Sequence, residues 1–327
     1  NGIVFGAGSQ VNVGGLVAST LQLSDADFMA GKLRFTQGNG AGGITNQGTL
    51  SGNVVALIAP QISNQGTISA TGGVAALAAG DVVNLDFSGD GLLKIQVDRG
   101  TYNALIENKA LIEADGGQVL MSAKTADALM STVINNEGTI RARTLANKAG
   151  RIVLIGDMDN GVATVGGTLD ASAPNGGDGG FVETSAAKVQ LQDGLKVTTE
   201  AVTGKTGEWL IDPTDFHIGA ISDWLPGGYS TRTADITGAA LASNLNSSNV
   251  TIQTSQGTQG AAGDIIVNDS IAYSGSTSRT LTLKAQRNII FNGVSDQSVT
   301  STGAPLNLVL WANAAGQDGV VFFNWTG

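Results

Sequence analysis

The sequence has no cysteine among its 327 residues, only one histidine and only five prolines. The absence of cysteine excludes a disulfide scaffold, thiol catalysis, and cysteine-ligated zinc or iron–sulfur sites. No apolar run reaches the roughly 18 residues that a membrane-spanning helix requires, and the longest runs are as short as VVALIA at 54–59. We therefore expect no membrane span, no metal and no cofactor.

Positive charge is also scarce. The sequence has 17 lysines and arginines and 27 aspartates and glutamates, which gives a net charge of −10. A nucleic-acid partner requires a basic stripe to neutralise phosphates, and the sequence shows none. Glycine is abundant instead, with 47 residues, which is about twice the usual share of ~7%. Glycine supplies turns while Val, Ile and Thr suit pleated surfaces, so the composition predicts a chain of strands and turns.

A nine-residue pattern recurs along the first half of the chain. Aligned on its asparagine, the spacings are 18, 44 and 28 residues, with a further 29 to a degenerate copy that has Val165 in the asparagine position. Such irregular multiples of a unit of about 20 exclude a fixed helical repeat. The copies are ITNQGTLSG at 44–52, ISNQGTISA at 62–70, IENKALIEA at 106–114 and INNEGTIRA at 134–142.

Each copy is followed by a glycine-containing turn and a second apolar strand, as in NVVALIA at 53–59 and GVAALAA at 73–79. Coils of this kind stack so that each strand pairs in parallel with its equivalent one coil away, about 4.8 Å distant, and form a β-solenoid. Paired short strands continue through 248–327. With coils of about 20 to 25 residues, the chain would hold about 13 to 16 of them.

Within the repeat, Ile62 and Ile68 are expected to face the interior, while Gly66 and Gly138 are expected to adopt positive φ at a corner. The asparagines lie where a side-chain amide can satisfy turn backbone groups and stack from coil to coil. We predict that they form a structural ladder, with ligand binding as the alternative. These residues are Asn46, Asn64, Asn108 and Asn136.

Residues 207–245 interrupt the pattern with an aromatic-rich stretch that contains His217 and ends in helical spacing at 238–245. We predict an extra-helical insertion that packs on the flank of the solenoid. Aromatic rings flanked by aspartates can stack on sugar rings, so a glycan-binding cluster is one interpretation and simple coverage of the solenoid is the other. The rings concerned are those of Trp209, Phe216, Trp224 and Tyr229.

The opening of the chain carries more specific motifs. GLVAST at 15–20 and SDADF at 24–28, preceded by Asn1-Gly2-Ile3, resemble the secretion domain of the filamentous haemagglutinin family of two-partner secretion exoproteins. In that family the first tripeptide ends an NPNGI motif, whose leading Asn-Pro is missing here together with the N-terminal cap. WLIDPTDFHI at 209–218 resembles a segment found downstream in long members.

This resemblance implies an all-β fold, a right-handed single-stranded parallel β-helix. It also implies export through a dedicated outer-membrane transporter, so the chain is expected to be secreted or held at the surface of a Gram-negative bacterium. Asn1, Gly2 and Ile3 would be the remnant of the secretion motif, although the same turn can simply shape an early coil. The predicted organisation is a secretion-domain β-helix at 1–190, a boundary and insertion at 191–247, and further β-helix of a stalk at 248–327.

Catalysis has little support in the sequence. Paired carboxylates occur, and polysaccharide-active β-helix enzymes use two carboxylates across a groove. The pairs nevertheless fall in predicted turns, where aspartate usually satisfies local backbone groups, so we predict that the chain is not an enzyme. The pairs are Asp25 with Asp27, Asp157 with Asp159, and Asp212 with Asp215.

The leading hypothesis is therefore a secreted adhesin that mediates attachment, or interaction with a biofilm or matrix. Its partners would be the transporter and a glycan, a matrix polysaccharide or a host receptor. The same architecture suits the stem of a contact-dependent toxin delivery protein. A polysaccharide-active enzyme is the third hypothesis.

Overall fold

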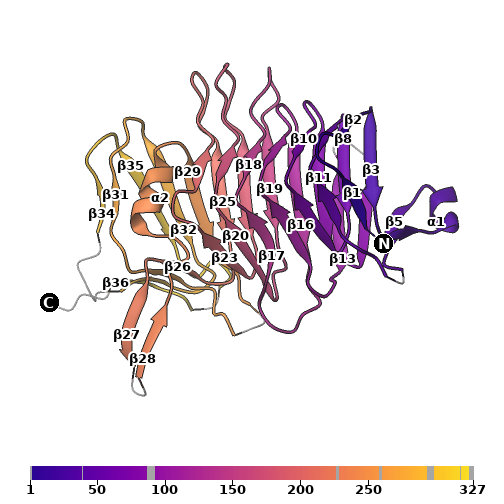
Figure 1. Cartoon of the computed structure of the whole chain (residues 1–327). Helices are drawn as coiled ribbons and strands as arrows, with labels where there is room; N and C mark the ends of the chain where they lie inside the picture. The colour runs from indigo at the N-terminus through magenta and orange to yellow at the C-terminus, as the bar shows by residue number, and fades with distance from the viewer. Residues whose placement is uncertain are drawn as a thin grey trace.

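The computed structural model describes residues 2–38, 40–86, 93–225, 228–257, 260–292, 298–316 and 318–323, and only the backbone of 221–225 and 228–232. Within these residues the chain winds into a parallel β-helix whose coils stack side by side along one axis (Figure 1). Strands of successive coils pair in parallel, so the predicted fold class is confirmed.

Each coil of the first part contributes one strand to each of three parallel sheets. The first sheet (sheet A) contains β1 (Ile3–Phe5), β6 (Ile44–Asn46), β9 (Gln61–Asn64), β14 (Leu105–Asn108), β17 (Ser131–Asn136), β20 (Gly161–Val165) and β23 (Lys188–Leu191). The second (sheet B) contains β2 (Gln10–Asn12), β7 (Thr49–Ser51), β10 (Thr67–Ser69), β15 (Leu111–Glu113), β18 (Thr139–Arg141), β21 (Thr168–Asp170) and β24 (Lys196–Thr198).

The third sheet (sheet C) runs through the whole described molecule. Its strands are β3 (Gly15–Ser19), β8 (Val54–Ile58), β11 (Val74–Ala79), β16 (Gln118–Ala123), β19 (Arg151–Ile155), β22 (Phe181–Ser185), β25 (Glu208–Asp212), β29 (Asn249–Gln253), β32 (Arg279–Lys284) and β35 (Leu306–Trp311). The nine-residue repeat thus covers a strand of sheet A, the corner and a strand of sheet B, and the apolar stretch after it forms sheet C.

Aliphatic side chains of all three sheets fill the interior in columns. Ile62 pairs in register with Ile44 and Ile106, and Ile68 pairs with Leu50 and Ile112. All of them are at most 1% exposed. Since a fully buried side chain of this size contributes about 1.5–3 kcal/mol, stacking identical positions makes the core the main source of stability.

The repeated corner glycines are required for a different reason from the one predicted. Neither Gly66 nor Gly138 has positive φ. A Cβ on Gly66 would instead lie 2.2 Å from the carbonyl oxygen of Gly48, and one on Gly138 would lie 2.2 Å from that of Ala110. At these two corners the neighbouring coil approaches so closely that a Cβ would collide with its backbone, whereas the third copy of the repeat has Ala110 in the equivalent position.

A four-stranded antiparallel sheet covers the outer face of sheet C near the N-terminal end, and it was not predicted. It consists, in order, of β13 (Lys94–Arg99), β12 (Val82–Asp86), β5 (Leu33–Thr36) and β4 (Gln22–Leu23), with α1 (Asp25–Met29) between the last two (Figure 1). The outward residues Ala76 and Ala78 of β11 pack against Phe35 and Val83. This second core explains why β11 is buried on both faces and lacks polar alternation.

After β24 the coils change their composition. Sheet A gives way to β26 (Phe216–Ile218), β30 (Ile265–Val267), β33 (Ile289–Phe291) and β36 (Val321–Phe323), and the side of sheet B is taken by α2 (Gly238–Leu245), β31 (Ile271–Tyr273) and β34 (Val299–Ser301). Thr237 caps α2 by accepting a hydrogen bond from the amide of Ala240 at 3.2 Å. Leu241 and Leu245 then bury the inner face of the helix in the solenoid core.

The insertion predicted at 207–245 is present and narrower than expected. Only the antiparallel hairpin of β27 (Ile221–Leu225) and β28 (Gly228–Arg232) projects from the body (Figure 1). The strands β25 and β26 belong to coils, and α2 replaces a strand. The sequence alone cannot show whether an aromatic segment is a buried strand of a coil or part of an insertion, because in both cases aromatic residues lie beside polar turns.

The solenoid contains fewer coils than the 13 to 16 expected. Sheet C has ten strands in the described part of the chain, so the stack spans about 43 Å at ~4.8 Å per step. The expected number was too high because the antiparallel sheet, the hairpin and several long loops take residues out of the coils. Sheet C crosses positions 190 and 247 without a break, and the predicted division into 1–190, 191–247 and 248–327 stays a prediction.

Candidate functional site

The opening coil carries the predicted remnant of the secretion motif. Asn1 lies outside the described residues. The amide of Ile3 donates to the carbonyl of Gly43 at 3.0 Å, and a Cβ on Gly2 would lie 2.7 Å from that same oxygen. Glycine at position 2 therefore allows the first coil to pack closely against the second. This close approach supports the interpretation that the motif shapes an early coil, and it does not test the role of the motif in export.

The SDADF segment forms the start of α1. Ser24 accepts a hydrogen bond from the amide of Asp27 at 3.1 Å and donates one to its carboxylate at 2.9 Å. This reciprocal cap explains the spacing of the motif. Phe28 and Met29 are 64% and 82% exposed, so the helix ends in an apolar tip.

The four asparagines of the repeat lie in one buried column of sheet A. Asn46 donates from Nδ2 to Oδ1 of Asn64 at 2.9 Å, Asn64 donates to Asn108 at 2.8 Å, and Asn108 donates to Asn136 at 2.8 Å. All four are 0% exposed. The structure thus arranges them as a continuous chain of amide hydrogen bonds along the axis, enclosed by the core and closed to any external ligand.

The ladder ends where the repeat degenerates. Val165 occupies the next position in the register, and Asn136 donates instead to the backbone carbonyl of Gly166 at 2.8 Å. At the other end Phe5 is in register with Asn46. Apolar residues therefore flank both ends of the ladder. The side-chain amide of Asn136, the last member, is hydrogen-bonded to backbone, as burial of a polar group requires.

The structure separates the four aromatic residues proposed to bind glycan. Trp209 and Phe216 are 0% exposed in the solenoid core, and the indole nitrogen of Trp209 donates to Thr184 at 3.3 Å. Burial contradicts the glycan-binding interpretation for these two residues, because a ring enclosed by the core has no face for a sugar. Trp224 and Tyr229 are opposite each other in the backbone register of the hairpin, and their side chains lie outside the described residues.

The carboxylate pairs act mainly on backbone groups. Asp157 accepts from the amides of Thr125 and Asp159, at 3.1 and 2.8 Å. One oxygen of Asp215 accepts from three successive amides, those of Ala262, Gly263 and Asp264, at 2.8–3.1 Å. Such bonds hold turns in place, in agreement with their predicted structural role.

Asp212 has a different environment, on the outer face of sheet C. Burial raises its pKa to about 6, and the neighbouring Glu183 carboxylate adds to this rise. A hydrogen bond from Gln253, at 3.3 Å, and the charge of Lys284 act in the opposite direction. Lys284 itself donates to Gln253 at 2.9 Å and lies 5.0 Å from the centre of the Trp311 ring.

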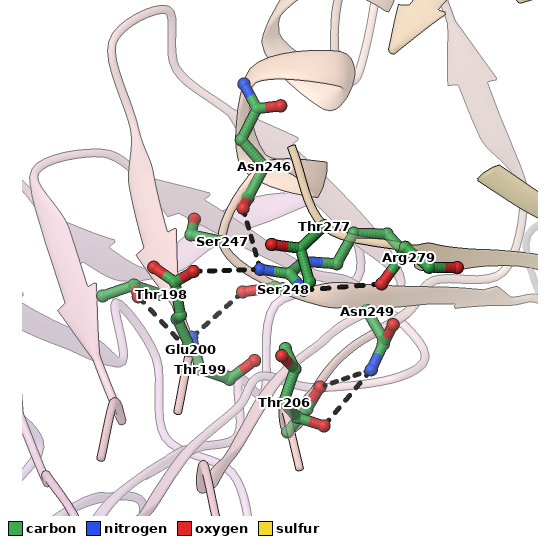
Figure 2. A network of polar contacts seen from close by, with 12 residues as sticks. Thr198, Thr199, Glu200, Thr206, Asn246, Ser247, Ser248, Asn249, Thr277 and Arg279 are labelled. Carbon is green, nitrogen blue, oxygen red and sulfur yellow. Dashed lines mark hydrogen bonds and ion pairs between the residues drawn. The ribbon is translucent and has the colours of Figure 1, made fainter. Parts of the chain in front are cut away.

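A buried arginine connects the two parts of the solenoid. Arg279 is 1% exposed, and its guanidinium donates to Glu200 at 3.2 Å and to the backbone carbonyl of Asn246 at 3.0 Å (Figure 2). Asn246 follows the last residue of α2, whose last turn contains no basic residue. Arg279 therefore supplies the positive charge that a helix C-terminus favours, from a strand one coil later.

Three long loops between sheets B and C form a raised wall, which we call the fin. It consists of 142–150, 171–180 and 199–207, which project beyond the coils (Figure 1). Ala173 donates to the carbonyl of Glu200 at 2.8 Å, and the amide of Lys205 donates to Asp178 at 2.8 Å. The loops are thus hydrogen-bonded to one another like the coils below them.

An open groove of about 490 Å³ runs between the fin and the outer face of sheet C. Its floor crosses β19, β22, β25, β29 and β32, which is about 19 Å at ~4.8 Å per strand. The fin contributes backbone at Gly150, Gly180 and Gly207, where a Cβ would collide with a neighbouring carbonyl. The side chains that line the floor are those of Arg151, Phe181, Glu208, Asn249, Thr251, Thr280 and Thr282.

Sequence reasoning missed this groove. Its residues come from five strands whose paired positions are 27 to 41 residues apart, as for Glu208 and Asn249. Each is an ordinary outward residue of an alternating strand, so only the parallel register, which aligns Arg151, Phe181 and Glu208 in one row, assembles them. The glycines that directly precede three of the five strands, Gly150, Gly180 and Gly207, were the one signal available.

Two further features of the described residues concern membranes and metals. No helix within them has the length and apolar character needed to cross a bilayer. They also contain no group of three or more His, Asp or Glu side chains placed to hold a metal ion.

Comparison with known proteins gives three findings. Residues 1–171 match the family model of the TPS secretion domain. The heme/hemopexin-binding protein of Haemophilus influenzae is 24% identical over an alignment of 221 residues, and the match covers 63% of this chain and 23% of that protein. The crystal structure of the HMW1 secretion domain from Haemophilus influenzae matches 99% of this chain and 78% of that chain, with a TM-score of 0.55 and 21% identity.

Proposed function

Because the chain belongs to the TPS secretion domain family, and is thus an exoprotein that a Gram-negative bacterium secretes through an outer-membrane transporter, we propose that it acts in attachment, as an adhesin. The chain spans about a quarter of the length of its curated relative, so the binding role is our inference from the surface of this region. Adhesion to a glycan, a matrix polysaccharide or a host receptor fits the polar face of the solenoid.

The observation that carries the proposal is the continuity of sheet C. It extends without interruption from the first coil, through the part matched by the family model, to β35. The groove beside the fin lies across the end of the matched region, at β19 to β32. A secreted rod with a preformed polar groove on its side has the features that attachment to an extended surface ligand requires.

An attachment assay tests this proposal. Beads coated with the purified chain are expected to adhere to epithelial monolayers or to bacterial matrix more strongly than beads coated with an equal mass of heat-denatured chain. Equal adherence of both bead preparations would contradict the role in adhesion.

The alternative role as the stem of a contact-dependent toxin delivery protein predicts a different phenotype. A strain lacking the exoprotein would then lose the ability to inhibit neighbouring cells in co-culture and would attach to surfaces as well as the parent strain. Loss of attachment with unchanged competition would favour the adhesin.

Export through the transporter allows a test of the opening motif. In the exoprotein co-expressed with its transporter, Asn1→Ala is expected to reduce the amount released into the medium severalfold, as measured by immunoblot. Gln65→Ala, at an exposed position of the repeat, serves as the control. Normal secretion of the Asn1 variant would leave the motif with only a structural role.

A further inference from the structure

We propose that the groove between the fin and sheet C binds a linear oligosaccharide that carries an acidic group, with Arg151 holding the acidic group. This inference names a ligand class for the proposed attachment role and rests on that role for its biological meaning. The site itself is inferred from the geometry and chemistry of the groove.

Arg151 provides the charged end of the groove. Its guanidinium lies 4.7 Å from the centre of the Phe181 ring, which orients the planar group by stacking. The ion pairs found among the described residues do not include Arg151. Glu208, the nearest acidic residue in the same row, is two strands away, about 10 Å. An oriented guanidinium without a protein carboxylate is suited to bidentate binding of a ligand carboxylate.

Beyond Phe181, the part of the floor formed by β25, β29 and β32 is polar and held in place. Asn249 donates to the carbonyl of Thr206 (Figure 2) and to that of Gly207, both at 3.2 Å. It accepts from the amide of Thr280 at 3.0 Å. Thr251 donates to Glu208 at 2.6 Å. Because these residues link three successive coils, a ligand would not have to order them on binding, which lowers the entropic cost of association.

The remaining lining groups suit hydroxyl-rich rings. Thr280 and Thr282 line the floor with side chains that can both donate and accept, and Glu208 adds an acceptor. Glu208, Asn249 and Thr280 lie in one row at the strand spacing along the axis, and Thr282 lies two residues further along β32. A linear saccharide presents hydroxyl groups of both kinds along its length, so it can match such a row at several points.

Other ligand classes fit less well. The sheet C strands of the floor are paired on both sides, so an extended peptide has no edge to join. The only aromatic ring of the lining, that of Phe181, lies under Arg151, which leaves no apolar anchor for a helix. A single lining cation in a chain of net charge −10 excludes a polyanion and favours a ligand with one acidic group.

Isothermal titration calorimetry with two matched probes tests the site. The acidic probe is aldotetraouronic acid, a xylotriose that carries one 4-O-methylglucuronate, and the neutral probe is xylotriose. The purified chain is expected to bind the acidic probe more tightly. Arg151→Gln should weaken binding of the acidic probe at least about tenfold and leave xylotriose binding within about twofold. Thr282→Val should weaken both probes by about three- to tenfold.

Arg34→Gln is the matched control, since it removes the same charge from an exposed position of the antiparallel sheet. Each variant is first checked for an unchanged melting curve, and for a variant that unfolds, Arg151→Lys and Thr282→Ser replace it. Absence of binding of both probes at millimolar concentration would overturn the proposal, as would equal effects of Arg151→Gln and Arg34→Gln.

The same variants distinguish this site from the adhesin role. A chain that binds the acidic probe through Arg151 but does not promote bead attachment would support the site and contradict the proposed function. A chain that promotes attachment but binds neither probe would support the proposed function and contradict the site.

Discussion

Single buried amides connect successive coils of sheet A. Each asparagine of the ladder donates to the next one and is fully buried, so every member supplies one bond and receives another, except at the ends. Buried amides of this kind cost free energy unless their partners are present. The ladder therefore makes the register of neighbouring coils depend on residues 18 to 44 positions apart.

Replacing a central member of the ladder should show this dependence. Asn64→Ala is expected to destabilise the chain by about 2–6 kcal/mol, because Asn46 and Asn108 each lose a buried hydrogen-bond partner at about 1–3 kcal/mol. Chemical denaturation followed by circular dichroism measures the change. Gln65→Ala, at the exposed neighbouring position, should change stability by less than about 0.5 kcal/mol. Equal effects of the two substitutions would contradict an energetic role for the ladder.

Asp212 should make stability depend on pH. Its pKa in the folded chain is about 6, above the ordinary value of 3.8, so the folded state binds the proton more tightly than the unfolded state. Its contribution to stability is therefore fully present below about pH 4 and is lost as the pH rises through about 6.

Asp212→Asn is expected to raise the melting temperature at pH 8 and to have little effect at pH 4. Thermal melts of both proteins across this range provide the measurement, and Asp193→Asn, at an exposed turn, is the control. A constant difference between the wild type and the Asp212 variant at every pH would show that burial does not perturb this carboxyl group.

At the scale of elements, close backbone contact at the corner between sheets A and B determines how the strands stack. Gly66→Ala is expected to cost several kcal/mol, since the new Cβ would lie 2.2 Å from the Gly48 carbonyl and the coils would have to separate. Gly14→Ala, where a Cβ meets nothing within 4 Å, should change stability by less than about 1 kcal/mol. Similar melting temperatures for both variants would mean that the corner can relax.

At the scale of the whole molecule, the solenoid is stabilised by contacts between adjacent coils, so a defect in one coil should spread to its neighbours. Ile68→Asp places an unpaired charge in the central column and is expected to cost several kcal/mol. Hydrogen exchange should show lost protection in β7 and β15, which pair with its strand. Val4→Asp, at a position 70% exposed, is the control. Unchanged protection in β7 and β15 would contradict coupling between coils.

The sequence by itself determined the repeat, the parallel stacking, the inward aliphatic columns and the family. These follow from local patterns, since alternating apolar residues, a recurring asparagine and a tight glycine corner act over a few neighbouring positions. The extra-helical hairpin was also visible as a break in that pattern.

Tertiary structure alone decided the antiparallel sheet, the core position of Trp209 and Phe216, and the groove beside the fin. An outward threonine or arginine on a strand has the same local sequence whether it faces open solvent or a walled groove. The distinction depends on which loops rise beside it and which strands lie next to it, and parallel pairing brings those strands from 20 or more positions away along the chain.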